Sequence, residues 1–306
     1  MDNVKMQKAV TVEEAVKWIG EHMSRKGLSQ SGMAKELGIS PGALSAYLNG
    51  KYPTPERVTA KIQEVMELQE RKAVAPKAPD YVETTVTGMV KQAMAYAHMR
   101  GVVSVAYGDA GVGKTTAVER YRQENQLAVV ITIMPTYSSI TGVNELLSEA
   151  LGVRERTDRK ITREIVNKLK GSGRVIIVDE AQHLTSRAIE HLRSISDAAG
   201  VGVCFVGNEL IYTKMLGNRK SEYSQLFSRI GVRKVVTTST NTREDIDRVF
   251  GGRGIGEESM EILYRISRTN YGLRGAVNVY VNTVGVYDEI TPDNLAKIVK
   301  DMNIAA

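Results

Sequence analysis

Eight residues, from Gly108 to Thr115, constrain the fold of this 306-residue chain more than any other segment. They read Gly-Asp-Ala-Gly-Val-Gly-Lys-Thr, a complete GxxxxGK(S/T) pattern between an apolar β-branched run and a helical pattern. In this setting the glycines let backbone amides point at phosphate oxygens, while Lys114 reaches the β and γ phosphates and Thr115 ligates Mg²⁺. The alternative is a glycine-rich turn that opens an ordinary helix. The predicted nucleotide-binding residues of this segment are Gly108, Asp109, Ala110, Gly111, Val112, Gly113, Lys114, Thr115 and Thr116.

Short β-branched runs alternate with helical stretches from residue 101 onward. Strands are predicted at residues 102–107, 127–133, 174–179, 201–206 and 232–236, with helices in the gaps. Strands this apolar, separated by helices of about ten or more residues, indicate a parallel sheet with both faces covered. After residue 241 the β pattern stops, and amphipathic helices are predicted at 242–249, 257–269, 272–286 and 291–302. The predicted fold class is therefore α/β with a small helical cap.

The third predicted strand ends in two acids, Asp179 and Glu180. Beyond a phosphate loop, such a pair is typical of a Walker B element, in which Asp179 holds Mg²⁺ through water and Glu180 orients and polarises the attacking water. On its own, an acidic pair at a strand end is more often the N-cap of a helix. No Asn-Lys-x-Asp motif follows the phosphate loop, since the nearest match, at residues 167–170, ends in Lys170. The expected cofactors are therefore ATP, rather than a guanine nucleotide, and Mg²⁺.

Three further polar positions resemble the sensors and the arginine finger of AAA+ ATPases. Asn208 follows the fourth predicted strand, Arg229 precedes the fifth, and Arg274 lies in a Gly-Leu-Arg-Gly sequence that opens a helix of the cap. The resemblance implies that Asn208 positions the lytic water as sensor 1, that Arg229 reaches the nucleotide of a neighbouring subunit, and that Arg274 is sensor 2. Without the phosphate loop, Asn208 is better interpreted as a turn residue and Arg229 as a solvated surface residue.

Residues 30–50 carry the pattern of a helix-turn-helix. Ala34, Gly38 and Leu44 occupy its small, turn and core positions, because Ala34 lets two helices approach and Gly38 permits the positive φ of the turn. A preceding helix has a start signal at Thr11, with Glu14 three residues later. The pattern resembles phage-repressor domains and predicts an all-α DNA-binding domain. Helical hairpins with a glycine turn also occur in proteins that do not bind DNA.

The second helix of this motif lacks side chains that read bases. Its N-terminal half offers small residues and no Arg, Gln or Lys for bidentate base contacts, so little sequence specificity is expected. Contacts to DNA, mainly to phosphates, are predicted for Lys35, Ser45, Lys51 and Arg57. The chain has a net charge of +6, and residues 1–80 carry 12 basic and 10 acidic residues, 12 − 10 = +2. The remaining net charge of +4 belongs to residues 81–306, so this part of the chain is also predicted to contribute to DNA binding.

A basic cluster beyond the second predicted strand is a candidate DNA-binding region in this part of the chain. In AAA+ proteins this region often carries loops that face a central pore, and the resemblance implies DNA contacts here. A mixed charge run is more often a solvated face, which is the alternative. The cluster consists of Arg154, Arg156, Arg159 and Lys160.

Length and composition bound the domain count and the cellular setting. At roughly 100 to 200 residues per domain, the chain has room for about two domains. The single cysteine, Cys204, excludes an intramolecular disulfide framework and suits a reducing cytosol. The longest apolar run, residues 201–206, is far shorter than the roughly 20 residues of a membrane helix. No signal segment is visible either, so a bacterial or phage-host cytoplasm is predicted and no membrane partner.

The whole arrangement resembles the phage Mu transposition protein B family. It combines a helix-turn-helix domain at 1–70, a Pro/Ala linker at 71–82, an AAA+ core with Asp-Glu-Ala-Gln-His at 83–240 and a cap at 241–306. The resemblance implies an ATPase, slow and stimulated by DNA and a partner, that binds double-stranded DNA with little sequence preference. It also implies self-assembly into a homo-oligomer or helical filament, capture of target DNA and activation of a partner transposase.

Other functional classes stay open at this point. A nucleotide-gated transcription regulator also combines a helix-turn-helix with an ATPase, and it should protect one discrete site on DNA. A remodelling or secretion AAA+ ATPase would need a protein substrate or a membrane anchor. A helicase is less favoured because only one phosphate-loop core is evident.

Overall fold

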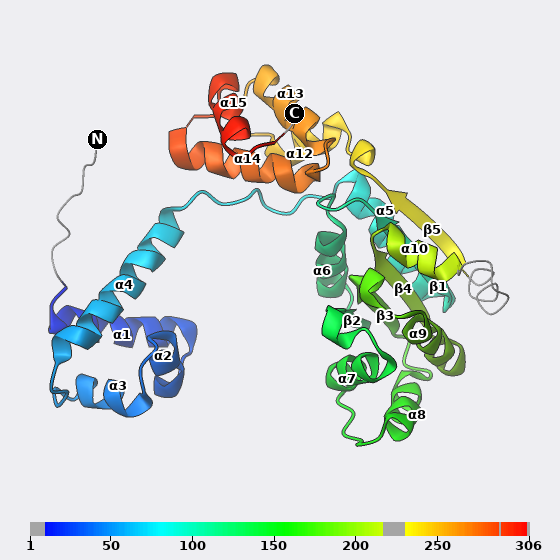
Figure 1. The fold of residues 1–306 in the computed structure, drawn as a ribbon, viewed down its shortest axis with the longest axis horizontal. Coiled ribbons are helices and arrows are strands. Elements are labelled where there is room, and N and C mark those ends of the chain that lie inside the picture. The colour runs from blue at the N-terminus through cyan, green and yellow to red at the C-terminus, as the bar shows by residue number, and fades with distance from the viewer. Residues whose placement is uncertain (1–9, 217–229, 288, 305–306) are drawn as a thin grey trace. The chain divides into compact units, whose positions relative to one another are not determined.

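The computed structural model describes residues 10–216, 230–287 and 289–304, and the chain divides into two compact units, Met1–Pro76 and Lys77–Ala306. The first unit consists, in its described part, of helices α1 (Val12–Lys26), α2 (Gln30–Glu36), α3 (Pro41–Leu48) and α4 (Pro55–Val74) (Figure 1). Helix α1 begins at a capping box between Thr11 and Glu14, as predicted. Gly38 has φ +61 in the turn between α2 and α3, and Met33, Leu44 and Ile62 lie fully buried. The helix-turn-helix architecture is thus confirmed.

Helix α4 continues through residue 74, which corrects the predicted start of the linker at residue 71. The residues from Arg71 to Ala73 are good helix formers, and only Pro76 stops the pattern. A proline disfavours the α conformation of the residue before it, and Ala75 is accordingly extended, with φ −60 and ψ 137.

The second unit is built on a parallel sheet of five strands. These are β1 (Val103–Gly108), β2 (Ala128–Thr132), β3 (Val175–Asp179), β4 (Gly202–Gly207) and β5 (Ile230–Val236), in the order β2-β3-β4-β1-β5. Every neighbouring pair is parallel. Each strand lies within two residues of its predicted position. The α/β class with a parallel sheet is confirmed.

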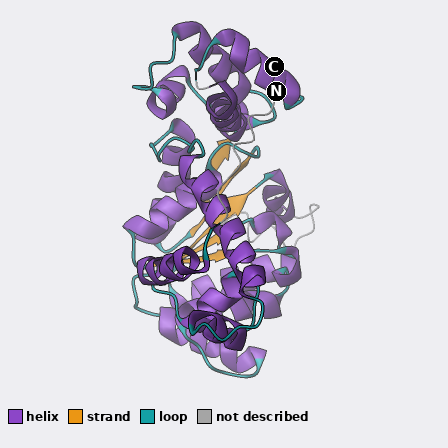
Figure 2. Ribbon diagram, turned by 90° about the vertical axis from the view of Figure 1, so that its left-hand side faces the viewer, coloured by secondary structure: helices purple, strands orange, loops and turns teal. Residues whose placement is uncertain are grey.

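Helices cover both faces of this sheet, as Figure 2 shows. They are α5 (Thr85–Arg100), α6 (Lys114–Glu124), α7 (Ile140–Leu151), α8 (Asp158–Leu169), α9 (Ser186–Ala199) and α10 (Glu209–Leu216). Alternate strand residues point to opposite faces: Val105 and Phe205 join the core under α7, α8 and α9, whereas Ala106 and Cys204 join the core under α5 and α6. Short 3-10 helices η1 (Pro135–Tyr137), η2 (Ala181–His183) and η3 (Thr238–Thr240) complete the unit's core.

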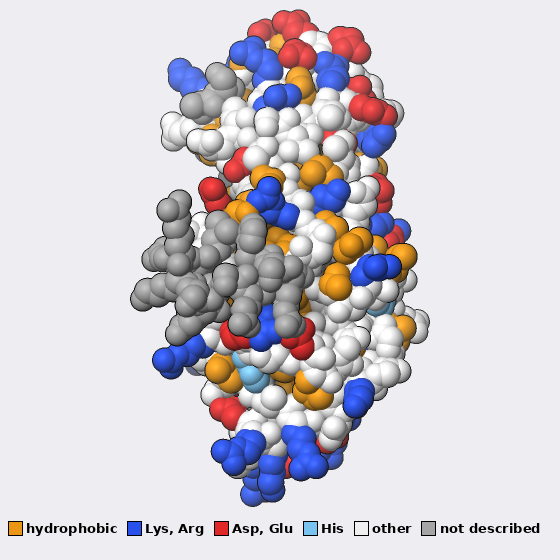
Figure 3. Space-filling view, turned by 90° about the vertical axis from the view of Figure 1, so that its right-hand side faces the viewer, with side chains coloured by type: hydrophobic (Ala, Val, Ile, Leu, Met, Phe, Trp, Pro, Cys, Tyr) orange, Lys and Arg blue, Asp and Glu red, His pale blue; other side chains and the backbone are white. Residues whose placement is uncertain are grey.

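Basic side chains gather at the end of this unit that α7 and α8 form (Figure 3). The side chains of Arg154, Arg156, Arg159 and Lys160, from the predicted basic cluster, are all exposed there, on the α7–α8 loop and the first turn of α8. The cluster is therefore accessible to a large polyanion.

The cap consists of α12 (Arg243–Phe250), α13 (Glu257–Ser267), α14 (Gly272–Tyr287) and α15 (Pro292–Asp301). These four helices match the prediction and enclose a core of their own around Phe250, Leu263 and Leu295. Among the described residues, no helix is long and apolar enough to span a membrane.

Cys204 lies in the middle of β4 with no exposed surface. Burial raises the pKa of its thiol to about 12, although a hydrogen bond with Ser104 opposes the shift. The thiol is therefore protonated and shielded from reagents in the folded protein.

Candidate nucleotide-binding site

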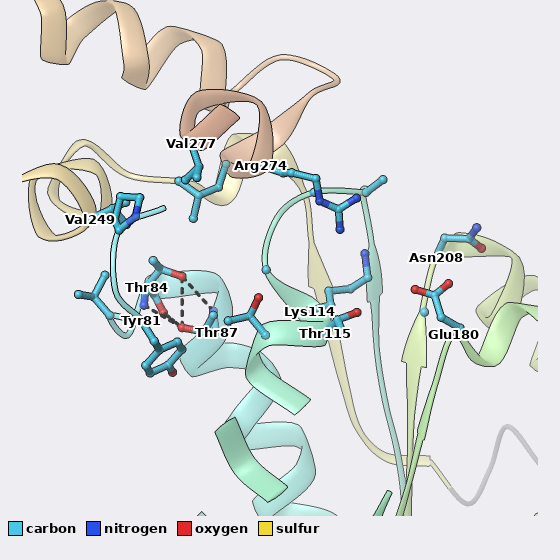
Figure 4. Close-up of a pocket in the computed structure, with 18 of the residues that line it drawn as sticks. Tyr81, Thr84, Thr87, Lys114, Thr115, Glu180, Asn208, Val249, Arg274 and Val277 are labelled. Atoms are coloured by element: carbon cyan, nitrogen blue, oxygen red, sulfur yellow. Dashed lines mark hydrogen bonds between the residues drawn. The ribbon is translucent and has the colours of Figure 1, made fainter. Parts of the chain in front are cut away.

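A cavity of about 500 Å³ opens at the carboxyl ends of β3, β4 and β1, which are neighbours in the sheet. In parallel α/β sheets, ligands bind outside the carboxyl ends of the strands. Figure 4 shows that the phosphate loop, the start of α5 and the start of α14 surround this cavity. Its polar lining comes from Asp80, Thr84, Thr87, Gly111, Gly113, Lys114, Thr115, Thr116, Glu180, Gln182, Asn208 and Arg274.

The phosphate loop has the backbone geometry that its glycines were predicted to permit. Gly108, Gly111 and Gly113 have φ values of +149, +72 and +106. A Cβ on Gly108 would lie 1.7 Å from the carbonyl oxygen of Val236, so only glycine fits beside β5 at this point. Val112 is fully buried and anchors the loop, and α6 begins at Lys114 without a side-chain cap. The free first-turn amides of α6 therefore face the cavity as phosphate donors.

Lys114 lies within the loop, where its Nζ donates to the carbonyl oxygens of Gly108 at 3.1 Å and Asp109 at 2.5 Å. Burial lowers the pKa of Lys114, and the carboxylates of Glu180 and Asp179 oppose that shift. A bound phosphate would add further negative charge beside the ammonium group and favour its charged form.

Thr115 lines the cavity, and Asp179 lies beside it, within hydrogen-bond distance of its hydroxyl group. Asp179 is 3% exposed, and burial raises the pKa of its carboxyl group, while hydrogen bonds from the Glu180 amide and the Thr115 hydroxyl oppose the rise. A buried carboxylate beside a hydroxyl group is a donor set that suits Mg²⁺, since the cation would favour the charged form of Asp179. The pair predicted to hold the metal is thus together.

Glu180 and Asn208 come from the adjacent ends of β3 and β4, and Figure 4 shows both side chains at the same side of the cavity. Glu180 is one of only two non-glycine residues with positive φ among the described residues, with φ +54. Such a conformation costs about 1 kcal/mol or more and occurs often at functional sites. Asn208 also behaves as a turn residue, because its Oδ1 accepts the amide of Leu210 at 3.0 Å. The two interpretations of Asn208 are therefore compatible.

The start of α14 packs directly on the phosphate loop. The backbone amide of Arg274 donates to the carbonyl oxygen of Gly111 at 2.9 Å. Gly272 has φ +61, and a Cβ there would lie 2.9 Å from Gly111 backbone atoms, so glycine is required for this approach. The Arg274 side chain lines the cavity as predicted, and the cap is joined to the loop through backbone atoms.

The sequence did not indicate the apolar end of the cavity. Its walls come from the segment before α5 and from the cap. The Tyr81 hydroxyl is buried without a hydrogen-bond partner, and the guanidinium of Arg120 lies 5.2 Å from the centre of the Tyr81 ring. An apolar cavity end with aliphatic walls suits a planar base. The residues concerned are Tyr81, Val82, Val249, Leu273 and Val277.

The remaining predicted site residues lie elsewhere. Arg229 is outside the described residues, so its position as an arginine finger stays a prediction. Lys35 on α2, Ser45 on α3 and Lys51 after α3 belong to the first unit, where Lys35 and Lys51 are exposed and Ser45 is half-buried.

Asp245 holds the cap against the start of α5. Its carboxylate is 1% exposed, and Oδ1 accepts the Thr85 amide at 2.7 Å and the Thr85 hydroxyl at 3.1 Å. Oδ2 accepts the amide of Thr242 at 3.0 Å, so one carboxylate serves the first turns of α5 and α12. Because both helices contribute to the cavity wall, this contact fixes two sides of the site relative to each other.

Replacing Asp245 by alanine is expected to destabilise the second unit by about 2 to 3 kcal/mol, because it leaves the Thr85 and Thr242 amides without their acceptor. Thermal unfolding followed by circular dichroism measures the loss. The matched control is Asp247→Ala, since Asp247 is 53% exposed and its ion pair with Arg243 at 3.2 Å is worth less than about 1 kcal/mol. Equal destabilisation by both variants contradicts the role given to Asp245.

Comparison with known proteins agrees with this geometry. The AAA domain family matches residues 97–216, and the helix-turn-helix family matches residues 23–60. Cdc6p from Pyrobaculum aerophilum shares the fold at a TM-score of 0.52 and 14% identity, covering 70% of this chain and 65% of that one. A Walker-type ATPase of Pyrococcus abyssi does so at a TM-score of 0.52 and 14% identity, covering 75% of both chains. These two likenesses support the AAA+ fold.

Curated relatives share much more sequence. The Mu-like prophage FluMu DNA transposition protein B of Haemophilus influenzae is 32% identical over 271 residues, which cover 85% of this chain and 93% of that protein. The ATP-dependent target DNA activator B of Escherichia phage Mu is 32% identical over 247 residues, covering 79% of this chain and 78% of that protein. With this identity over most of both chains, the protein belongs to the Mu DNA transposition protein B family.

Proposed function

We propose that this protein is an ATPase that, with ATP bound, coats DNA of any sequence as a homo-oligomeric filament, captures it as a transposition target and activates a partner transposase. The observation that carries the proposal is the cavity lined by the phosphate loop and Glu180, with Asp179 hydrogen-bonded to Thr115 of that loop, in a chain that also has a helix-turn-helix domain. Relatives named ATP-dependent target DNA activator B support the role in transposition. The protein acts in the cytoplasm of the bacterial host, where its DNA lies.

In this proposal, the residues of the cavity divide the hydrolysis of ATP to ADP and phosphate among them. The loop amides, Lys114 and Arg274 hold the phosphates in line. Thr115 and Asp179 would hold Mg²⁺, whose charge would offset the negative charge of the phosphates. Glu180 accepts hydrogen bonds from the attacking water and polarises it, and Asn208 orients the same water from the next strand.

Arg229 is proposed to act on the nucleotide of the neighbouring subunit. Hydrolysis then depends on assembly, because an isolated subunit lacks one cation at its γ-phosphate. On this proposal, turnover is slow in isolated subunits and rises when DNA and the transposase bring subunits together.

Contacts to DNA are proposed for both units. Lys35, Ser45 and Lys51 of the first unit approach the phosphates, and the first turn of α3 presents only small, uncharged side chains. In the second unit the exposed cluster of Arg154, Arg156, Arg159 and Lys160 adds positive charge without base readout. Both surfaces favour binding to any sequence.

Fluorescence anisotropy with several unrelated DNA duplexes tests this function. With ATP present, affinities for the duplexes should agree within about threefold and should fall at least about tenfold between about 50 and about 200 mM salt. Negative-stain electron microscopy with ATP and random-sequence DNA should show filaments. Isolated single particles on the DNA would contradict the proposal.

The helix-turn-helix match supports a second candidate, a nucleotide-gated transcription regulator. A regulator should prefer one duplex strongly in competition binding and protect one discrete site. The uncharged start of α3 disfavours that outcome, because a recognition helix normally presents Arg, Gln or Lys to the bases.

A further inference from the structure

We infer that Gln182 is a positioning residue for hydrolysis: its side-chain amide ties the Glu180 carboxylate to the tip of β4 and so directs Glu180 into the cavity. The inference rests on the proposed ATPase function and extends it to a residue outside the phosphate loop, the Walker B acids and the sensor positions. The observations behind this inference are two hydrogen bonds of the Gln182 side chain and the space that the neighbouring backbone leaves for that side chain.

The two hydrogen bonds of the Gln182 side chain point in fixed directions. Nε2 donates to Oε2 of Glu180 at 2.5 Å, and Oε1 accepts the backbone amide of Asn208 at 3.2 Å. A backbone amide can only donate and a carboxylate can only accept, so the two ends of the Gln182 amide cannot be exchanged. The Gln182 amide therefore has one possible orientation, with Oε1 toward the end of β4 and Nε2 toward Glu180.

The backbone around Gln182 is shaped for this connection. A Cβ on Gly207 would lie 2.5 Å from Oε1 of Gln182, so glycine at the end of β4 makes room for the amide. Lys214 on α10 donates from Nζ to the carbonyl oxygens of Gln182 at 2.5 Å and Leu184 at 2.8 Å, which fixes η2 from the other side. Gln182 is thus held by its backbone and by its side chain.

The Glu180 side chain needs a hydrogen-bond partner to fix its orientation. Its side chain is 45% exposed, and a half-exposed Glu loses rotamer entropy on being fixed, by up to about 2 kcal/mol. The only other side chain of the described residues recorded near Oε2 is His183, whose Nε2 lies 4.0 Å away, beyond hydrogen-bond distance. With Oε2 engaged by Gln182, Oε1 is the oxygen left to accept a proton from water in the cavity.

The connection also sets the spacing between two proposed catalytic groups. Asn208 receives the hydrogen bond through its backbone, while its side chain lines the cavity. Glu180 and Asn208 come from different strands, and Gln182 bridges them directly. Loss of the Gln182 side chain should leave the phosphate contacts intact, since none of its hydrogen bonds among the described residues involves Lys114 or Thr115. It should, however, misplace the Glu180 carboxylate that activates water.

The test compares Gln182→Met and Gln182→Ala with the wild type in DNA-stimulated ATP hydrolysis. Methionine keeps the length and packing of glutamine but cannot donate or accept as the amide does. Both variants should lower kcat about tenfold or more, as expected for a misplaced catalytic group, and leave the Kd of a fluorescent ATP analogue within about twofold. Gln126→Ala, at an exposed position after α6, is the matched control and should hydrolyse ATP at the wild-type rate.

A double-mutant cycle with Glu180→Gln then separates this inference from the proposed function. If Gln182 acts through Glu180, Gln182→Met should slow single-turnover hydrolysis no further in the Glu180→Gln background. A further slowing there, or wild-type kcat in Gln182→Met alone, overturns the positioning role. Wild-type turnover in Glu180→Gln itself would instead overturn the proposed role of Glu180. If Gln182→Ala is lost to misfolding, Gln182→Met, which retains the packing, decides the question.

Discussion

Replacing Lys114 by alanine is expected to weaken nucleotide binding about 100-fold and, with it, nucleotide-dependent binding to DNA. The Lys114 ammonium group lies inside the phosphate loop, where its Nζ donates hydrogen bonds to the carbonyl oxygens of Gly108 and Asp109. The phosphates of a nucleotide bound in this loop would lie next to that positive charge. Loss of a charge-assisted contact in a partly desolvated site should raise the Kd for ATP about 100-fold, which corresponds to about 2.7 kcal/mol.

Titration with a fluorescent ATP analogue measures the Kd, and anisotropy with labelled duplex DNA measures the linked effect. The matched control is Lys168→Ala, which removes the same charge from an exposed position on α8. Nucleotide affinity should stay at the wild-type value in that control. Wild-type DNA affinity with ATP in Lys114→Ala would separate DNA binding from the nucleotide and contradict the proposed coupling.

Replacing Glu180 by glutamine is expected to lower kcat about 100-fold or more while ATP affinity stays unchanged, since the amide cannot act as a base. Glutamine has the same shape, and its carbonyl oxygen can still accept the hydrogen bond that Gln182 Nε2 donates. The site should therefore stay assembled around uncleaved ATP.

Trapped ATP should make the protein persist on DNA. Negative-stain images taken at increasing times after ATP is depleted should show filaments for Glu180→Gln after those of the wild type have dispersed. Glu145→Gln, at an exposed position on α7, is the matched control and should disperse like the wild type. Rapid dispersal of the Glu180→Gln filaments would count against Glu180 as the group that activates water.

The sheet and the phosphate-binding half of the site followed from local sequence. Five apolar runs have the length and β-branched content of buried strands, and the phosphate loop is a contiguous motif whose geometry its own glycines dictate. The acids at the end of β3 and Asn208 at the end of β4 could be placed beside it because the carboxyl ends of parallel strands share one edge of the sheet.

The base-binding half could not be predicted in this way. Tyr81 lies in a Pro-rich stretch without periodicity, and Val249 and Val277 have the spacing of ordinary helical core residues. Only the tertiary fold brings these three positions together. Gln182 carried a weak signal, its place two residues after Glu180, but its role depends on a contact with β4 that no local pattern records.

The burial of Cys204 has a practical consequence for watching this protein at work. The only thiol of the chain lies inside β4 and is protonated at any ordinary pH, so it will not compete for a maleimide dye. A cysteine introduced on an exposed helix would then be the sole labelling position in an otherwise unaltered sequence. Single-molecule fluorescence on stretched DNA can therefore follow the native chain, without first removing a cysteine from its core.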